Sequence, residues 1–337
     1  MLVIVGKFAL GLVPALVYLA ALVVLDSYKL VRLRTVLAAF AAGCVALVFC
    51  NYLNAWLLDL TGLSVPHFAR YVAPVTEEAA KSVFLVWLIR RRRIGFMVDA
   101  AIVGFASGAG FGILENIFYL RLIPEAGVVT WVLRGCGTAL MHGSTVAIMA
   151  LIYHTRGPAP DRVRGVRVLG AYLAAVLLHS LYNHFFVSPI IATLILVIGV
   201  PLLTVSVYGR SEKALEKWLG TGFDTDAEML AIMSEGRISE TPVGIYLMEL
   251  RDRFPATVVA DMFCLLRVQT ELAIEAKGVL MMRKEGVELE PREGLQEKIA
   301  ELHFLEKSIG PTGRLALQPL RKGGVRDTWE KHLLQGK

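Results

Sequence analysis

The chain has 337 residues, of which 55% are hydrophobic, and a formal net charge of +6 at pH 7. This composition is too apolar for one ordinary soluble domain of this length. The charge is uneven, because residues 1–210 hold 17 Lys and Arg against 8 Asp and Glu, whereas residues 211–337 hold 18 against 21. The excess positive charge lies in short loops between apolar segments, so it does not indicate a nucleic-acid partner.

Seven segments are predicted to cross a bilayer, since each approaches the roughly 20 apolar residues that a spanning helix needs. They are residues 5–25, 35–58, 71–89, 96–120, 128–153, 166–187 and 189–208. The third segment is the least apolar, because Glu77, Glu78 and Lys81 interrupt it. Residues 1–210 are therefore expected to form an all-α, polytopic helical membrane bundle.

Basic residues in the loops predict the orientation of the bundle. The loop 26–34 carries Lys29, Arg32 and Arg34, residues 90–93 are all arginine, and the loop 154–168 carries four more arginines. If seven spans alternate, these loops all fall on one side, and the positive-inside rule places that side in the cytoplasm. The prediction is a multi-pass protein of the cell (inner) membrane, with its N-terminus outside and its C-terminus in the cytoplasm.

Five ionisable residues lie within the apolar segments, namely Glu77, Glu78, Glu115, His142 and His179. An ionisable side chain at such depth costs several kcal/mol and usually marks a functional site. At ~1.5 Å per residue, Glu78, Glu115 and His179 lie roughly 8–12 Å below the outer surface, and His142 lies deeper. This coincidence favours one shared site, and carboxylates beside imidazoles are suited to activating water. An intramembrane hydrolase is the first hypothesis.

The first motif places two carboxylates near one lysine. Glu77 and Glu78 precede Lys81 by four and three residues, so either can reach it along a helix. One lysine neutralises only one of them, and the other needs a proton, a metal or a second partner. The structural alternative is a buried ion pair that holds two helices together.

The second motif, Glu115 with Asn116, follows glycines at positions 104, 108 and 112. Three glycines four residues apart form a smooth helix face, which lets another helix approach closely. The alternative for Glu115 is a hydrogen-bonded structural carboxyl. Arg134, in the next segment, is interpreted as a shallow partner for Glu125 or for a lipid headgroup.

The remaining motifs are a lone His142 and the pair His179 and Asn183. A lone histidine on an apolar helix is more often a hydrogen-bonded structural residue than a ligand. His179 and Asn183 are four residues apart and share a helix face, so they could bind one ligand or one oxyanion.

Taken in order, the four motifs resemble those of the PrsW-type intramembrane proteases, a family related to the CAAX prenyl endopeptidase superfamily. The motifs are Glu-Glu-x-x-Lys (77–81), Phe-x-x-x-Glu-Asn (111–116), the lone His142 and His-x-x-x-Asn (179–183). The resemblance covers roughly residues 70–187. It implies a protease that makes the first, extracytoplasmic-side cut in a membrane-anchored anti-sigma factor. The site residues that it implies are Glu77, Glu78, Glu115, His142, His179 and Asn183.

Two mechanisms are compatible with these residues. In the first, Glu115, His142 and His179 bind Zn²⁺ while Glu78 acts as general base and Lys81 orients the glutamate pair. In the second, which needs no metal, Glu78 activates water directly, and His179 with Asn183 stabilises the oxyanion. The sequence leaves both open.

Residues 211–337 are expected to form a soluble, cytoplasmic helical domain that binds a partner or a second copy of the chain, with helices over 256–284 and 291–308. Two other classes compete with the protease. A transporter or proton-coupled channel also uses buried Glu and His residues, although the chain shows no internal repeat. The third class is a scaffold that has kept an old site.

Overall fold

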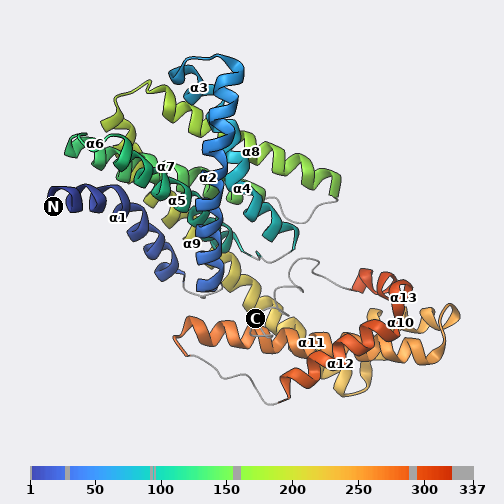
Figure 1. Ribbon diagram of the computed structural model, residues 1–337. Helices are drawn as coiled ribbons and strands as arrows, with labels where there is room; N and C mark the ends of the chain where they lie inside the picture. Colours follow the sequence, from blue (N-terminus) through green and yellow to red (C-terminus); the bar gives the residue numbers. More distant parts are fainter. Residues whose placement is uncertain are drawn as a thin grey trace. The chain divides into compact units, whose positions relative to one another are not determined.

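The computed structural model describes residues 2–26, 31–91, 94, 96–154, 161–287 and 294–320. These residues form helices and connecting turns without a strand, which confirms the predicted all-α class (Figure 1). The chain divides into two compact units, Met1–Ser211 and Glu212–Lys337. Several basic residues of the predicted cytoplasmic loops, Lys29, Arg92, Arg93 and Arg156, lie outside the described residues.

The first unit is a bundle whose elements follow one another with short connections. They are α1 (Leu2–Leu25), α2 (Leu33–Thr61), α3 (Val65–Tyr71), α4 (Ala73–Arg90), α5 (Met97–Leu122), α6 (Val128–Leu133), the π-helical turn η1 (Arg134–Thr138), α7 (Ala139–His154), α8 (Asp161–His184) and α9 (Pro189–Ser234). The boundary between the two units falls within α9.

Six stretches of the described chain are long and apolar enough to cross a membrane. They are Val5–Leu25, Leu33–Thr61, Met97–Leu122, Val128–Tyr153, Gly165–His184 and Pro189–Lys213. They correspond to six of the seven predicted segments. The remaining predicted segment, 71–89, does form a helix, but the 18 residues of α4 include Glu77, Glu78, Lys81 and Arg90. The polar residues that make this segment a candidate site also remove it from the set of apolar spans.

Helix α5 is the centre of the bundle and lies between α2 and α7 (Figure 1). Every residue from Val98 to Ile113 is buried. A helix that is apolar on all sides is stable only when other helices surround it, which fits this position.

Glycines bring the backbones of these helices into contact. A Cβ atom on Gly108 would lie 2.0 Å from the carbonyl oxygen of His142, and one on Gly104 would lie 2.8 Å from that of Val146. On the opposite face, a Cβ on Gly110 would lie 2.0 Å from the carbonyl oxygen of Phe40. The predicted smooth face is therefore the contact with α7, and it brings the backbone of His142 against α5.

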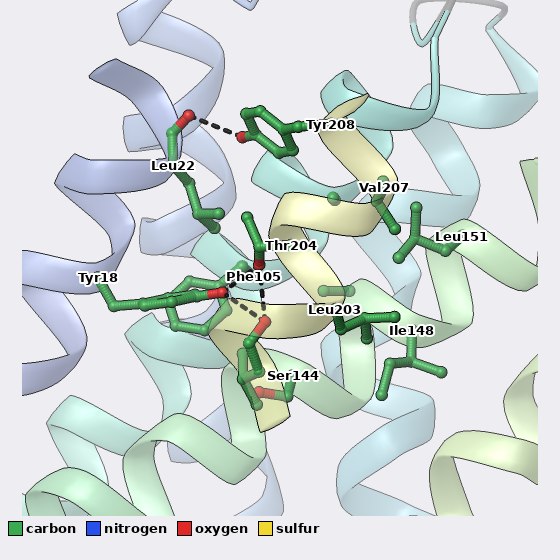
Figure 2. Close-up of a pocket in the computed structure, with 13 residues that line it drawn as sticks. Tyr18, Leu22, Phe105, Ser144, Ile148, Leu151, Leu203, Thr204, Val207 and Tyr208 are labelled. Carbon is green, nitrogen blue, oxygen red and sulfur yellow. Dashed lines mark hydrogen bonds between the residues drawn. The ribbon is translucent and has the colours of Figure 1, made fainter. Parts of the chain in front are cut away.

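The first part of α9 is tied to α1 by tyrosine side chains around a small cavity of about 30 Å³ (Figure 2). The hydroxyl of Tyr208 donates to the carbonyl oxygen of Leu22 at 2.7 Å. The hydroxyl of Tyr18 donates to the carbonyl oxygen of Val200 at 3.2 Å and is also hydrogen-bonded to Thr204. None of the predicted site residues lines this cavity, so it is separate from the candidate site.

The second unit has a hydrophobic core of its own, which includes Met262, Leu265, Leu272 and Leu302. Its elements are α10 (Pro242–Glu249), α11 (Ala256–Lys284), α12 (Leu295–Ser308) and α13 (Gly310–Ala316), with short 3₁₀ turns η2 (Arg237–Glu240), η3 (Leu250–Asp252) and η4 (Gln318–Leu320). The helix predicted over 256–284 coincides with α11. The helix predicted over 291–308 begins at Leu295 in α12, and residues 291–293 lie outside the described part of the chain.

The close contact between α5 and α7 predicts the effect of a single methyl group. We expect Gly108→Ala to destabilise the protein by about 1–3 kcal/mol, because the new Cβ overlaps the backbone of α7 and the helices must separate. Thermal unfolding in detergent would measure this. Gly199→Ala in α9, where a Cβ would meet nothing within 4 Å, is the matched control and should leave the unfolding temperature unchanged or slightly higher. Equal behaviour of the two variants would contradict the packing argument.

Candidate active site

A buried ion pair lies at the centre of the candidate site. The Nζ atom of Lys81 donates to Oε1 of Glu78 at 2.6 Å, and both side chains are 0% exposed. Two opposite charges are tolerated in an apolar interior only when they are paired and hydrogen-bonded. Glu77 and Glu78 are both within reach of Lys81 along the helix, and the fold pairs Lys81 with Glu78.

Three elements meet at the same oxygen atom of Glu78. Besides Lys81, Oε1 accepts a hydrogen bond from Thr145 Oγ1 on α7 at 3.1 Å and one from His179 Nδ1 on α8 at 2.8 Å. A carboxylate only accepts, so His179 carries its hydrogen on Nδ1 and leaves a lone pair on Nε2. Glu78 thus fixes the tautomer and the orientation of His179.

His142 is held from two sides. Nζ of Lys81 lies 2.9 Å from Nδ1 of His142, and because an ammonium only donates, Nδ1 accepts and Nε2 carries the hydrogen. Nε2 in turn lies 3.2 Å from Oε2 of Glu115. The rings of His142 and His179 meet edge to face with centroids 4.9 Å apart. The sequence placed His142 deeper than the other groups, but these contacts put it at their level.

Glu77 is the carboxylate of the cluster without a lysine or arginine partner among the described residues. Its Oε2 lies 3.9 Å from Nε2 of His179, and its Oε1 accepts a hydrogen bond from Asn54 Nδ2 on α2 at 3.3 Å. The amide of Asn54 is oriented by Thr76, whose hydroxyl donates to Asn54 Oδ1 at 2.6 Å. The Glu77 side chain is 15% exposed, so this carboxylate can be reached from outside the bundle.

Glu115 has a cation of its own. Nη2 of Arg134 lies 3.2 Å from Oε2 of Glu115, and the Glu115 side chain is 21% exposed. The interpretation of Arg134 as a partner for Glu125 or for a lipid headgroup is therefore wrong. The fold places the π-helical turn η1 against α5, which brings the guanidinium to Glu115.

The cluster contains a set of donors suited to a metal. Ligand atoms of Glu77, His142 and His179 all lie within 4.8 Å of one another. Two imidazoles and one carboxylate form a common catalytic zinc site, so the donor types fit. Nε2 of His179 already offers its lone pair, whereas His142 would have to exchange its present hydrogen bonds. The carboxylate of this set is Glu77, whereas the sequence suggested Glu115.

Asn183 occupies a different position from the one predicted. Its Nδ2 donates to the carbonyl oxygen of Ala69 at 2.9 Å, which ties α8 to α3. Among the described contacts it has none with the cluster. Conversely, Asn54 and Thr145 contact the cluster and were missed, although each is a polar residue within an apolar segment, which was the available signal.

An apolar helical bundle that surrounds interacting carboxylates and imidazoles has the groups that a membrane-embedded hydrolase needs. Residues 27–207 match the family model described as PrsW family intramembrane metalloprotease. The match covers more than half of the chain, so the chain belongs to this family and is a multi-pass membrane peptidase. Membership supports the peptidase over the transporter and scaffold classes that the sequence left open. Neither a curated protein nor a solved structure matches the chain.

The central ion pair gives a test of how the site is held together. We expect Lys81→Met to lower stability by about 3–5 kcal/mol, because it leaves the Glu78 carboxylate buried without a counter-charge. The double variant Glu78→Gln/Lys81→Met should recover a large part of this loss, since no charge then remains unpaired. Unfolding of the purified proteins in detergent would measure both. Equal losses in the single and the double variant would show that the pair is not the stabilising element.

Proposed function

We propose that this peptidase cleaves a membrane-anchored regulatory protein of the anti-sigma-factor type on the extracytoplasmic side of the inner membrane. We also propose that Glu77 is the general base of the peptidase. The observation that carries the assignment of Glu77 is the distribution of charge. Lys81 pairs with Glu78, and Arg134 pairs with Glu115. Glu77 is left beside both histidines, and among the described residues its hydrogen-bond partner is an amide, that of Asn54. This assignment moves the role of base from Glu78 to Glu77.

Peptide hydrolysis assigns a task to each of these groups. Glu77 accepts a proton from water as the oxygen of that water attacks the substrate carbonyl carbon, and it returns the proton to the amide nitrogen as the C–N bond breaks. His142 carries its hydrogen on Nε2, beside Glu115, and this N–H can also donate to the oxyanion that forms on the substrate. The Glu78–Lys81 pair keeps both imidazoles in place during the reaction.

The family description as a metalloprotease supports a metal, and Zn²⁺ would be held by Glu77, His142 and His179. When bound, the metal would supply a Lewis acid that activates water and polarises the carbonyl group. Glu77 would then act as a ligand, and two carboxylates would remain beside the imidazoles, Glu78 at 2.8 Å from His179 and Glu115 at 3.2 Å from His142.

The position of the cluster along its helices supports a cut on the extracytoplasmic side. Glu77 lies four residues after the start of α4, Glu115 seven before the end of α5, and His179 five before the end of α8. These offsets correspond to roughly 6–10 Å from one face at ~1.5 Å per residue. If α4 counts as a seventh crossing, the basic loops and the C-terminus lie in the cytoplasm and this face is the outer one.

The second unit supports a separate role for residues 211–337. It has its own hydrophobic core, and the family match ends at residue 207. We assign it as a cytoplasmic helical domain that binds a partner or a second copy of the chain, while residues 1–210 form the protease domain.

Substitution of the two neighbouring glutamates separates the two assignments of the base. Loss of a general base costs typically 10²–10⁴ in rate, so Glu77→Gln should lower cleavage of a membrane-anchored reporter in proteoliposomes by that factor without changing the unfolding temperature. Glu78→Gln should lower stability together with activity. The exposed Glu125→Gln is the control and should behave as the parent protein. Full activity in Glu77→Gln would rule out the role proposed for this residue.

Metal content decides between the two mechanisms. If Glu77, His142 and His179 hold a metal, protein purified without a histidine tag should contain about one zinc ion per chain by mass spectrometry, and a chelator should abolish cleavage until zinc is restored. His179→Ala should lose the metal as well as the activity. Cleavage that continues without metal but stops in Glu77→Gln would instead establish the mechanism that uses glutamate alone.

A further inference from the structure

Arg134 lies within the apolar stretch Val128–Tyr153, where an arginine is costly and usually functional. It is the first residue of the π-helical turn η1, and such turns frequently occur at functional sites. Close packing holds the turn in place. A Cβ atom on Gly135 would lie 1.9 Å from the carbonyl oxygen of Leu10, and one on Gly137 would lie 2.5 Å from the hydroxyl of Tyr182. Helices α1 and α8 therefore fix the position from which Arg134 extends.

All of the side-chain contacts of the Arg134 guanidinium shown by the structure are made to one stretch of α5. Its Cζ atom lies 3.6 Å from the centroid of the Tyr119 ring, and its Nε donates to Oδ1 of Asn116 at 2.9 Å. Asn116 is itself held, because its Nδ2 donates to the carbonyl oxygen of Gly11 at 2.7 Å. A planar guanidinium that stacks on a ring and donates along its edge has one orientation, which a lysine could not reproduce in full.

The third contact connects Arg134 to the reacting groups. Oε2 of Glu115 lies 3.2 Å from Nη2 of Arg134 and also 3.2 Å from Nε2 of His142. The same carboxylate oxygen thus contacts the arginine on one side and a histidine of the catalytic cluster on the other. Without the guanidinium, Glu115 would have no cation to set its rotamer, and His142 would keep only its bond to Lys81.

We propose that Arg134 is a positioning residue for the peptidase reaction, which fixes Glu115 and through it the orientation of the His142 ring. The proposal rests on the function proposed above, because it takes His142 as part of the catalytic cluster. It adds to the machinery a residue of the apolar stretch Val128–Tyr153 that lies outside the four motifs. Arg134 acts through Glu115 and does not itself touch the reacting atoms.

The test combines kinetics with a cycle of substitutions. Loss of a side chain that orients a reacting group typically lowers activity by about 10–100-fold. Arg134→Gln should therefore lower kcat by about that factor and leave KM within about twofold. Arg134→Lys should recover part of the loss, as should guanidinium ion added to Arg134→Ala at non-denaturing concentration. In a Glu115→Gln background, Arg134→Gln should cause no further loss. The exposed Arg121→Gln, at the same end of α5, is the control and should leave kcat unchanged.

A second measurement does not depend on cleavage. In protein with ¹⁵N-labelled histidine, the ring signals of His142, assigned by their loss in a His142 variant, should shift in Arg134→Gln in the same way as in Glu115→Gln, and not in Arg121→Gln. Unshifted signals, full activity in Arg134→Gln, or an equal further loss in the Glu115→Gln background would each overturn the proposal. If Glu77→Gln stays active while the histidine signals shift as expected, the function assigned to Glu77 fails and the positioning role of Arg134 stands.

Discussion

The buried ion pair between Glu78 and Lys81 is the interaction on which the site depends. It places a full positive and a full negative charge in an interior where neither would be tolerated alone, and the same two groups hold the two imidazoles of the candidate site. Glu78 orients His179 through Nδ1, and Lys81 orients His142 through Nδ1. The pair therefore fixes the relative orientation of two rings that come from different helices.

Electroneutrality then separates three chemically identical carboxylates into different roles. Lysine and arginine are available for two of them, because Lys81 pairs with Glu78 and Arg134 with Glu115. The remaining one, Glu77, is partly exposed and lies beside the lone pair of His179. Because no lysine or arginine among the described residues pairs with it, Glu77 is the carboxylate best placed to change its proton or bind a cation, and this is the reason for proposing it as the base.

Helix packing supplies the distances that this chemistry needs. Glycines on both faces of α5 let its backbone touch α7 and α2, which carry His142 and Asn54. Larger side chains at these positions would push the helices apart and lengthen the hydrogen bonds of the site. The small residues of the apolar segments are therefore as much a part of the site as the polar ones.

The sequence by itself determined the all-α class, six of the seven spans that it predicted, and the membership of Glu77, Glu78, Glu115, His142 and His179 in one region. It could do so because hydropathy and the energetic penalty of buried charge are properties of each segment alone. It also limited the ion-pair partner of Lys81 to one of two neighbouring glutamates, Glu77 or Glu78. Tertiary structure decided which glutamate Lys81 pairs with, and it turned Arg134 toward Glu115 and Asn183 toward Ala69. These outcomes depend on the rotation and approach of whole helices, and such helix–helix geometry is not encoded in the spacing of residues along any one of them.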